Sequence, residues 1–202
     1  MPEGVYTVMD GKGNPVGTEQ FRAARAPAGS RYFAEIQTDV PTPHAETIDL
    51  IVGEDGRPIR LQVDTGAHEL RLDAHGDRLV GTLDGEPLEL PWGPDDHLDY
   101  LSPSFNAVTA NLLDGTAEID VNYLDPVTCA PRRVRQRYEL LGDQEVSTPV
   151  GRFEARAWRY TAVESGFTKR LWVAGDIVVA YEDVFELAAY QPGLSGPFPR
   201  PG

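Results

Sequence analysis

Apolar and polar residues alternate along most of this chain, and a period of two predicts half-buried β-strands. The longest alternating run covers residues 150–160, where Phe153 and Ala157 fall on one face and Trp158 and Tyr160 fall on the opposite, charged face. Large aromatic side chains on the charged face indicate that this second face is covered in part. The same alternation predicts further strands at 5–9, 16–24, 31–38, 47–52, 59–64, 69–73, 78–83, 87–91, 117–124, 133–140, 169–173, 177–181 and 185–190.

Turn signals separate these strands. Asp-Gly pairs stand at 55–56 and 84–85 between β-rich runs, and Asp-Gly is a strong hairpin marker. Short strands with regularly spaced turns favour an antiparallel meander over β–α–β units. We therefore expect a mainly β fold, a single curved antiparallel sheet of the half-barrel or spiral β-roll type, in one domain at 1–190. The stretch 191–202 is rich in Pro and Gly and is expected to form a C-terminal tail.

One segment breaks the strand pattern and predicts a short helix near 102–113. Ser102 is suited to the N-cap, and Pro103 is suited to the first helical position. Because an isolated helix of this length is marginally stable, its stability is expected to come from packing on the sheet. Three apolar residues at helical spacing form the face that would pack there: Phe105, Val108 and Leu112.

The chain is strongly acidic. Its 202 residues include 32 Asp and Glu against 18 Lys and Arg, which gives a net charge of −14. Such a charge repels phosphate backbones, so we expect no nucleic-acid partner. The sequence has no secretory signal and no apolar run of the roughly 20 residues that a transmembrane helix needs. The cytoplasm is therefore the predicted location, and an export signal removed before Met1 is the alternative.

Candidates for nucleophilic catalysis are scarce. Cys129 is the single cysteine of the chain, which fits a reducing compartment, and no general base stands near it in sequence. A buried thiol is therefore favoured over a nucleophile. No serine has the context of a nucleophile elbow, and we predict no catalytic residue. The histidines lie in separate turns or at strand edges, at His44, His68, His75 and His97.

The densest group of metal-ligating side chains precedes the predicted helix. It contains Asp95, Asp96, His97 and Asp99, and carboxylate oxygens suit hard cations. However, the spacing matches no known metal-binding loop, and Asp-rich turns are common in acidic proteins. We predict neither a metal nor another cofactor.

Seven aromatic residues are candidates for lining an apolar ligand pocket. Large side chains with polar tips suit amphiphilic ligands. Ordinary packing in the core is the alternative for each of them. The candidates are Trp92, Tyr100, Phe105, Tyr123, Tyr138, Trp158 and Trp172.

Basic residues are concentrated on one predicted strand, where Arg133, Arg135 and Arg137 share a face. These side chains are candidates for binding an anionic headgroup. The alternative is a solvent-exposed face whose arginines pair with acidic residues on the neighbouring strand.

Several segments follow one another in a characteristic order: a strand, a Ser-Pro-x-x-Asn helix start, a strand ending near a proline, and a Gln-Arg-Tyr strand. This order resembles the bacterial glycolipid-binding family. The resemblance covers 31–190 and implies a spiral or half-barrel antiparallel sheet akin to bacterial lipoprotein carriers, with no catalytic residue to carry over. The chain departs from the family at 95–99, where the acidic residues before the helix are arranged differently. The matching segments are 99–106, 121–124, 135–141, 151–155 and 177–182.

These observations lead to the hypothesis of a binding protein without enzymatic activity. Its partner would be a hydrophobic or amphiphilic small molecule, lipid-like and in one version a glycolipid, held between the curved sheet and the helix. The alternative is a structural or protein-interaction domain without a ligand cavity, whose edge strand could form a homo-oligomer. A hydrolase or isomerase is a third class, and two titratable groups converging in one cavity would mark it.

Overall fold

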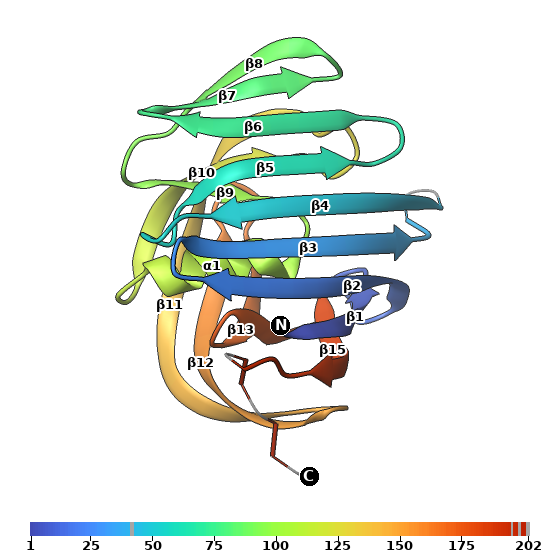
Figure 1. The fold of residues 1–202 in the computed structure, drawn as a ribbon. Coiled ribbons are helices and arrows are strands. Elements are labelled where there is room, and N and C mark those ends of the chain that lie inside the picture. The colour runs from blue at the N-terminus through green and yellow to red at the C-terminus, as the bar shows by residue number, and fades with distance from the viewer. Residues whose placement is uncertain (41–42, 195, 198, 201–202) are drawn as a thin grey trace.

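A long curved sheet and one enclosed helix make up the structure (Figure 1). The computed structural model describes residues 1–40, 43–194, 196–197 and 199–200, and in these residues it has fifteen strands and one α-helix. The prediction of a mainly β fold with one short helix is confirmed. The strands are β1 (Glu3–Met9), β2 (Pro15–Ala26), β3 (Gly29–Thr38), β4 (His44–Val52), β5 (Pro58–Asp64), β6 (Glu69–His75), β7 (Arg78–Leu83), β8 (Glu86–Pro91), β9 (Asp96–Asp99), β10 (Ala117–Leu124), β11 (Pro131–Thr148), β12 (Gly151–Ala162), β13 (Phe167–Ala174), β14 (Ile177–Tyr181) and β15 (Phe185–Gln191), and the helix is α1 (Pro103–Leu112).

The described strands form one sheet made of two successive meanders. Strands β1 to β8 follow one another along one half of the sheet, and β9 to β15 follow one another along the other half. The two halves join where β1 pairs antiparallel with β15. The first and last strands of the described chain therefore lie side by side in the middle of the sheet.

The sheet curves further than the predicted half-barrel. Strands β8 and β9 form its two outer edges, yet only residues 92–95 connect them, so the two edges lie close together. Asn122 Nδ2 donates to the Pro91 carbonyl at 2.8 Å, and an Arg57 Nη donates to the Gly93 carbonyl at 2.6 Å. Because strands twist, a sheet this long coils back on itself. The half-barrel is thus corrected to a nearly closed, barrel-like sheet.

Helix α1 lies inside the curve of the sheet, between the front wall of β2 to β4 and the rear wall of β11 (Figure 1). Ser102 is its N-cap, as predicted. Its buried residues include Ala107 and Ala110 as well as Phe105 and Val108, so the predicted single apolar face is too narrow. A helix buried on most sides belongs to the core. Its small alanine side chains allow it to pack closely against β14 and β9.

One strand pair departs from the predicted antiparallel meander. Strand β9 runs parallel to β10, and α1 connects them, so this part of the chain is a β–α–β unit. A helical crossover returns the chain in its original direction, which produces a parallel pair. The alternation of apolar and polar residues did not predict β9, because this strand is short and rich in polar residues.

Strand β11 is longer than predicted and carries a bulge. It covers residues 131–148, and Leu141 has no partner on β12 because the register shifts at this point. Opposite the bulge, the neighbours Ala157 and Trp158 are both buried. A bulge changes the direction of the side chains around it. Trp158 and Tyr160 therefore lie in the core together with Phe153 and Ala157, which corrects the prediction that the two pairs fall on opposite faces.

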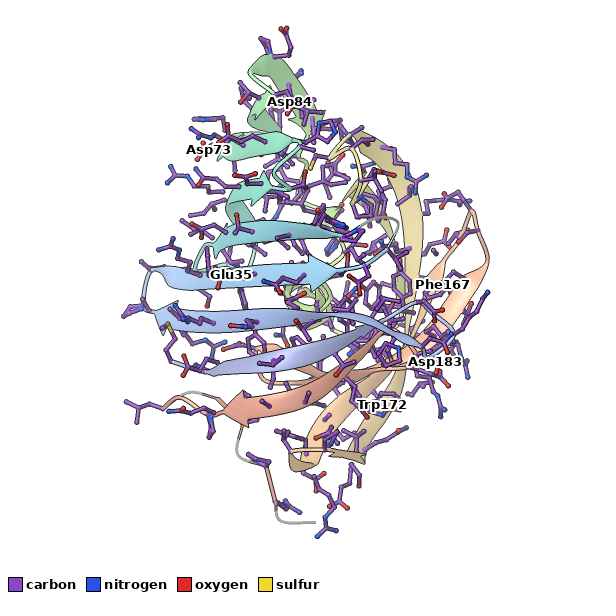
Figure 2. The ribbon with its side chains drawn as sticks, turned by 90° about the vertical axis from the view of Figure 1, so that its right-hand side faces the viewer. Glu35, Asp73, Asp84, Phe167, Trp172 and Asp183 are labelled. Carbon is purple, nitrogen blue, oxygen red and sulfur yellow. The ribbon has the colours of Figure 1, made fainter. Side chains whose placement is uncertain are left out.

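Side chains fill most of the interior (Figure 2), and the buried apolar residues form one continuous core. Among the described residues, no helix is long and apolar enough to cross a membrane. Of the predicted tail at 191–202, residues 195, 198 and 201–202 lie outside the described residues. Within the described part, Arg200 forms an isolated antiparallel bridge with Arg152.

Candidate functional site

A cavity of about 320 Å³ opens beside the N-terminus of α1. Residues from every strand between β9 and β15 line this cavity, and residues at the start of α1 complete its wall. Most of the lining surface is apolar. Small-molecule sites commonly measure about 300–1,000 Å³, so this cavity suits a small ligand.

A larger hollow lies elsewhere on the molecule but has a different character. It measures about 570 Å³, and its lining mixes charged residues such as Asp96 and Glu118 with apolar residues such as Leu113 and Ile119. Two of its charged side chains, Arg135 and Glu118, pair with each other at 3.0 Å. The cavity beside α1 is the stronger candidate, because it combines apolar walls with a buried charge that has no such partner.

That buried charge belongs to Asp99, on the floor of the cavity. Its side chain accepts a hydrogen bond at 2.5 Å from Gln136 Nε2, and the residue is only 8% exposed. Within the described part of the chain, no basic side chain forms an ion pair with it. Burial raises the pKa of Asp99 to about 6, although the hydrogen bonds from Gln136 and the Tyr100 amide act to lower it. Above that pH, Asp99 is a buried carboxylate without a counter-ion.

Two amide side chains lie in the same wall as Asp99, and each uses one of its two N–H groups inside the protein. Gln136 donates to Asp99, and Asn106 Nδ2 on α1 donates to the Tyr138 hydroxyl at 3.0 Å. In the described residues no donor binds the carbonyl oxygen of either amide. Amide oxygens are hydrogen-bond acceptors. The floor of the cavity therefore offers acceptors to a ligand.

Aromatic rings form the wall next to this floor. Tyr123, Tyr160 and Tyr181 line the cavity, and the Tyr160 ring lies 5.9 Å from Tyr181 and 6.3 Å from Phe167 between centroids. Burial, followed by the charge of Asp99, raises the pKa of Tyr123 and Tyr160. The phenol groups are therefore protonated at neutral pH and can face a ligand with either their rings or their hydroxyl groups.

The mouth of the cavity carries charged and apolar side chains together. The Arg132 guanidinium lies over the Tyr123 ring, 4.7 Å from its centroid, and Glu164 is the acidic residue at the mouth. Leu101 and Phe167 are 41% and 37% exposed, and Figure 2 shows Phe167 at the edge of the molecule. Exposed apolar side chains around an opening suit the entry of an apolar molecule.

The predicted ligand-binding aromatics divide between the cavity and the core around it. Tyr100 and Tyr123 line the cavity. Tyr138 lies behind it, where it accepts the hydrogen bond from Asn106. Phe105 packs 6.2 Å from the Tyr100 ring, and Trp158 packs 6.1 Å from the Tyr138 ring.

The remaining two tryptophans lie away from the cavity. Trp92 is buried at the corner where the sheet nearly closes, with the Arg57 guanidinium 4.7 Å from its ring centroid. Trp172 lies on the outer face of β13, where its Nε1 donates to Gln144 Oε1 at 3.1 Å. The structure instead adds Tyr160 and Tyr181 to the cavity wall.

The predicted headgroup arginines lie on the outer face of β11. In the same strand, Gln136 faces the interior, so the arginines and the cavity-lining Gln136 lie on opposite faces of the sheet. The arginines are largely matched by acidic residues: Arg133 pairs with Asp96, Arg135 pairs with Glu118, and Arg137 is exposed on the same face.

A second group of buried polar residues lies next to the helix start. Glu19 on β2 has no exposed surface; its Oε1 accepts from Ser102 Oγ at 2.8 Å, and its Oε2 has no partner in the described structure. Burial raises the pKa of Glu19 to about 8; the Ser102 hydrogen bond opposes this shift and the charge of Glu46 adds to it. Glu46 accepts a hydrogen bond from the Tyr100 hydroxyl and lies 2.7 Å from His44 Nε2. This group adjoins the cavity through Ser102 and Tyr100, which line it.

Replacing Ser102 by alanine is expected to destabilise the protein by about 2 kcal/mol, because it removes both the helix cap and the donor to buried Glu19. Chemical denaturation measures this change. Ser147→Ala is the matched control, since Ser147 is exposed on β11, and we expect its effect to stay within about 0.5 kcal/mol. Equal effects of the two substitutions would contradict the role assigned to Ser102.

The acidic segment before the helix is divided by strand β9. Asp96 pairs with Arg133 on the outer side, and Asp99 lines the cavity. No group of three or more His, Cys, Asp or Glu is placed to hold a metal ion in the residues that the structure describes. Cys129 is a buried free thiol, and burial raises its pKa to about 12.

Comparison with known proteins identifies the fold. A DUF1089 family protein from Pseudomonas aeruginosa superposes with a TM-score of 0.56 at 20% sequence identity, over 83% of this chain and 91% of that chain. A β-barrel-like protein of domain of unknown function DUF1849 from Brucella abortus gives a TM-score of 0.55 at 12% identity, over 98% and 97% of the two chains. This chain has their barrel-like fold. At these identities the likeness extends to the fold alone, and no protein-family model and no curated protein matches the chain.

Proposed function

We propose that the protein binds a small amphiphilic molecule in the cavity beside α1. The observation that carries this proposal is the division of one cavity into apolar walls and a polar floor. Burial of the apolar part of a ligand would supply most of the affinity. Hydrogen bonds to Asp99, Gln136 and Asn106 would fix its orientation.

The size of the cavity limits the buried part of such a ligand to a short chain or a ring. A longer lipid, including the glycolipid that the sequence resemblance suggests, would extend past the exposed side chains of Leu101 and Phe167. The proposed role is binding without catalysis. Burial raises the pKa of every tyrosine that lines the cavity in the described structure, so these phenols stay protonated at neutral pH and none of them is an activated nucleophile.

Filling the cavity should abolish binding. Ala162 lines the cavity and pairs with Gln136 across β11 and β12, so both side chains point to the same face of the sheet. In Ala162→Phe the new ring would occupy the ligand's place. We expect the affinity for 1-octanol, measured by isothermal titration calorimetry, to fall by at least about tenfold.

The matched control places the same ring on the other face of the sheet. Thr161 precedes Ala162 on β12 and faces outward, where its hydroxyl contacts Thr168 at 3.1 Å. Thr161→Phe should bind 1-octanol like the wild type. The absence of octanol binding to the wild-type protein, or equal affinity in both variants, would overturn the proposal.

A further inference from the structure

The polarity of the cavity floor indicates which chemical group a ligand presents to it. We propose that the polar end of the ligand is a protonated amine, received by Asp99. This inference rests on the proposed function and adds the class of the ligand's polar group.

The first support is the excess of acceptors on the floor. Asp99 contributes carboxylate oxygens, and Gln136 and Asn106 contribute amide oxygens, while one of the two N–H groups of each amide is already bound within the protein. A primary ammonium group carries three donors and no acceptor. It therefore matches this floor, whereas a carboxylate would bring further acceptors and a second negative charge.

The second support is the missing counter-ion. Asp99 is 8% exposed, and its only side-chain partner in the described residues is the neutral amide of Gln136. Buried charges in proteins are normally paired. An ammonium group at this position would form the ion pair that the described residues do not supply.

The third support is the aromatic wall. Tyr123, Tyr160 and Tyr181 surround the approach to Asp99, and Phe167 continues the same row of rings. Cations are attracted to the faces of aromatic rings. A pocket that combines aromatic rings with one buried carboxylate is thus suited to an organic cation with an apolar body.

The other charges near the cavity are compatible with this assignment. Arg132 stacks on the Tyr123 ring at the mouth and forms no ion pair with Asp99 in the described structure, and Glu164 at the mouth is paired with Arg135, whose Nε lies 3.8 Å from Glu164 Oε1. The net charge of the chain is −14, so its long-range field also attracts cations.

Three ligands with the same chain and different polar ends test the assignment: octylamine, 1-octanol and sodium octanoate. At pH 7.5 and constant ionic strength, calorimetry should show octylamine binding about ten- to hundredfold more tightly than 1-octanol, as a hydrogen-bonded charge pair warrants. Octanoate should bind most weakly, because Asp99 repels it.

Asp99→Asn keeps an acceptor for Gln136 and removes the charge. We expect this variant to lose the advantage of octylamine, so that the ratio of its affinities for octylamine and 1-octanol falls from about ten- to hundredfold to about one. Asp120→Asn is the control for the general field of the protein, since Asp120 is exposed on β10 outside the cavity. The control should keep the preference for the amine.

The pH dependence gives a further readout. The charged and titratable groups that line the site in the described structure are Asp99, Glu164, Arg132 and four tyrosines, namely Tyr100, Tyr123, Tyr160 and Tyr181. Because protonation of Asp99 removes the charge that attracts the amine, octylamine affinity should fall below about pH 6 in the wild type and stay level in Asp99→Asn.

The outcomes separate the two proposals. If 1-octanol binds and Ala162→Phe abolishes its binding, but octylamine has no advantage or keeps its advantage in Asp99→Asn, then the amine assignment is wrong and the proposed function stands. If none of the three ligands binds to the wild-type protein, the proposed function fails. Binding of octylamine that is lost in both Asp99→Asn and Ala162→Phe would support both.

Discussion

At pH 9, Glu19→Gln is expected to be more stable than the wild-type protein by several kcal/mol. Glu19 is completely buried, and its Oε2 has no partner in the described structure, so its charged form is poorly solvated. Glutamine has nearly the same shape and cannot ionise, and its amide oxygen can keep the hydrogen bond from Ser102. The variant therefore avoids the cost of a buried, unpaired negative charge.

The direction of this effect follows from proton linkage. The pKa of Glu19 is about 8 in the folded protein against an ordinary value of 4.5, so the folded state binds more protons between these two values. Stability therefore falls as pH rises from about 5 to about 8. At 1.36 kcal/mol for each pKa unit, the complete loss is on the order of 5 kcal/mol. Asp99, with a folded pKa of about 6 against 3.8, adds a smaller loss of the same sign between those values.

Urea denaturation from pH 5 to pH 9 measures this prediction. The wild-type protein should lose stability steeply across the range, and Glu19→Gln should show a much flatter profile. Glu35→Gln is the matched control, because Glu35 is exposed on the adjacent strand β3, and its profile should follow the wild type. A wild-type protein whose stability is constant from pH 5 to pH 9 would show that Glu19 does not carry the raised pKa.

Gly81→Ala is expected to destabilise the protein by at least about 2 kcal/mol, because the added methyl group overlaps backbone atoms. Gly81 on β7 pairs with Leu72 on β6. A Cβ at Gly81 would lie 1.7 Å from the Arg71 carbonyl oxygen and 2.7 Å from the carbon of that carbonyl. The clashing atoms belong to the backbone of β6 and not to a flexible side chain. The methyl group can therefore be accommodated only if β6 and β7 separate locally, which breaks their hydrogen bonds.

The control is the same substitution at a glycine with free space around it. Gly115 follows α1, and a Cβ there would meet no atom within 4 Å. Gly115→Ala should change the free energy of unfolding by no more than about 0.5 kcal/mol. Both variants can be compared by chemical denaturation, and a Gly81→Ala protein as stable as Gly115→Ala would refute the steric role of Gly81.

Much of the fold could be predicted from local sequence. The alternation in β10 and β14 predicts both strands with their observed bounds, and Ser102 marks the start of α1. The closure of the sheet could not be predicted in this way, since it depends on the accumulated twist of many strands and on contacts such as that of Asn122 with Pro91. The bulge at Leu141 could not be predicted either. Gly142-Asp143 has the composition of a turn, so the sequence pattern ends the strand at residue 140.

The site could be predicted only in part. Tyr100 and Tyr123 could be predicted as cavity residues because they are large aromatic side chains with polar tips. The inward position of Asp99 could not be predicted, because it depends on β9, a strand that is defined by its parallel pairing with β10. The burial of Glu19 could have been predicted from its position, because Glu19 alternates in phase with the buried residues Phe21 and Ala23 on β2. Its charge argued against an inward position.

The pairing of β1 with β15 has a consequence for how the chain folds. Within each meander, most strands pair with a neighbour in sequence, so these ladders can form early and with little loss of loop entropy. The β1–β15 ladder joins residues as distant as Glu3 and Gln191. During synthesis on the ribosome it can form only after the second meander has emerged. We therefore expect this seam to be the slowest part of the sheet to form, because high contact order slows folding.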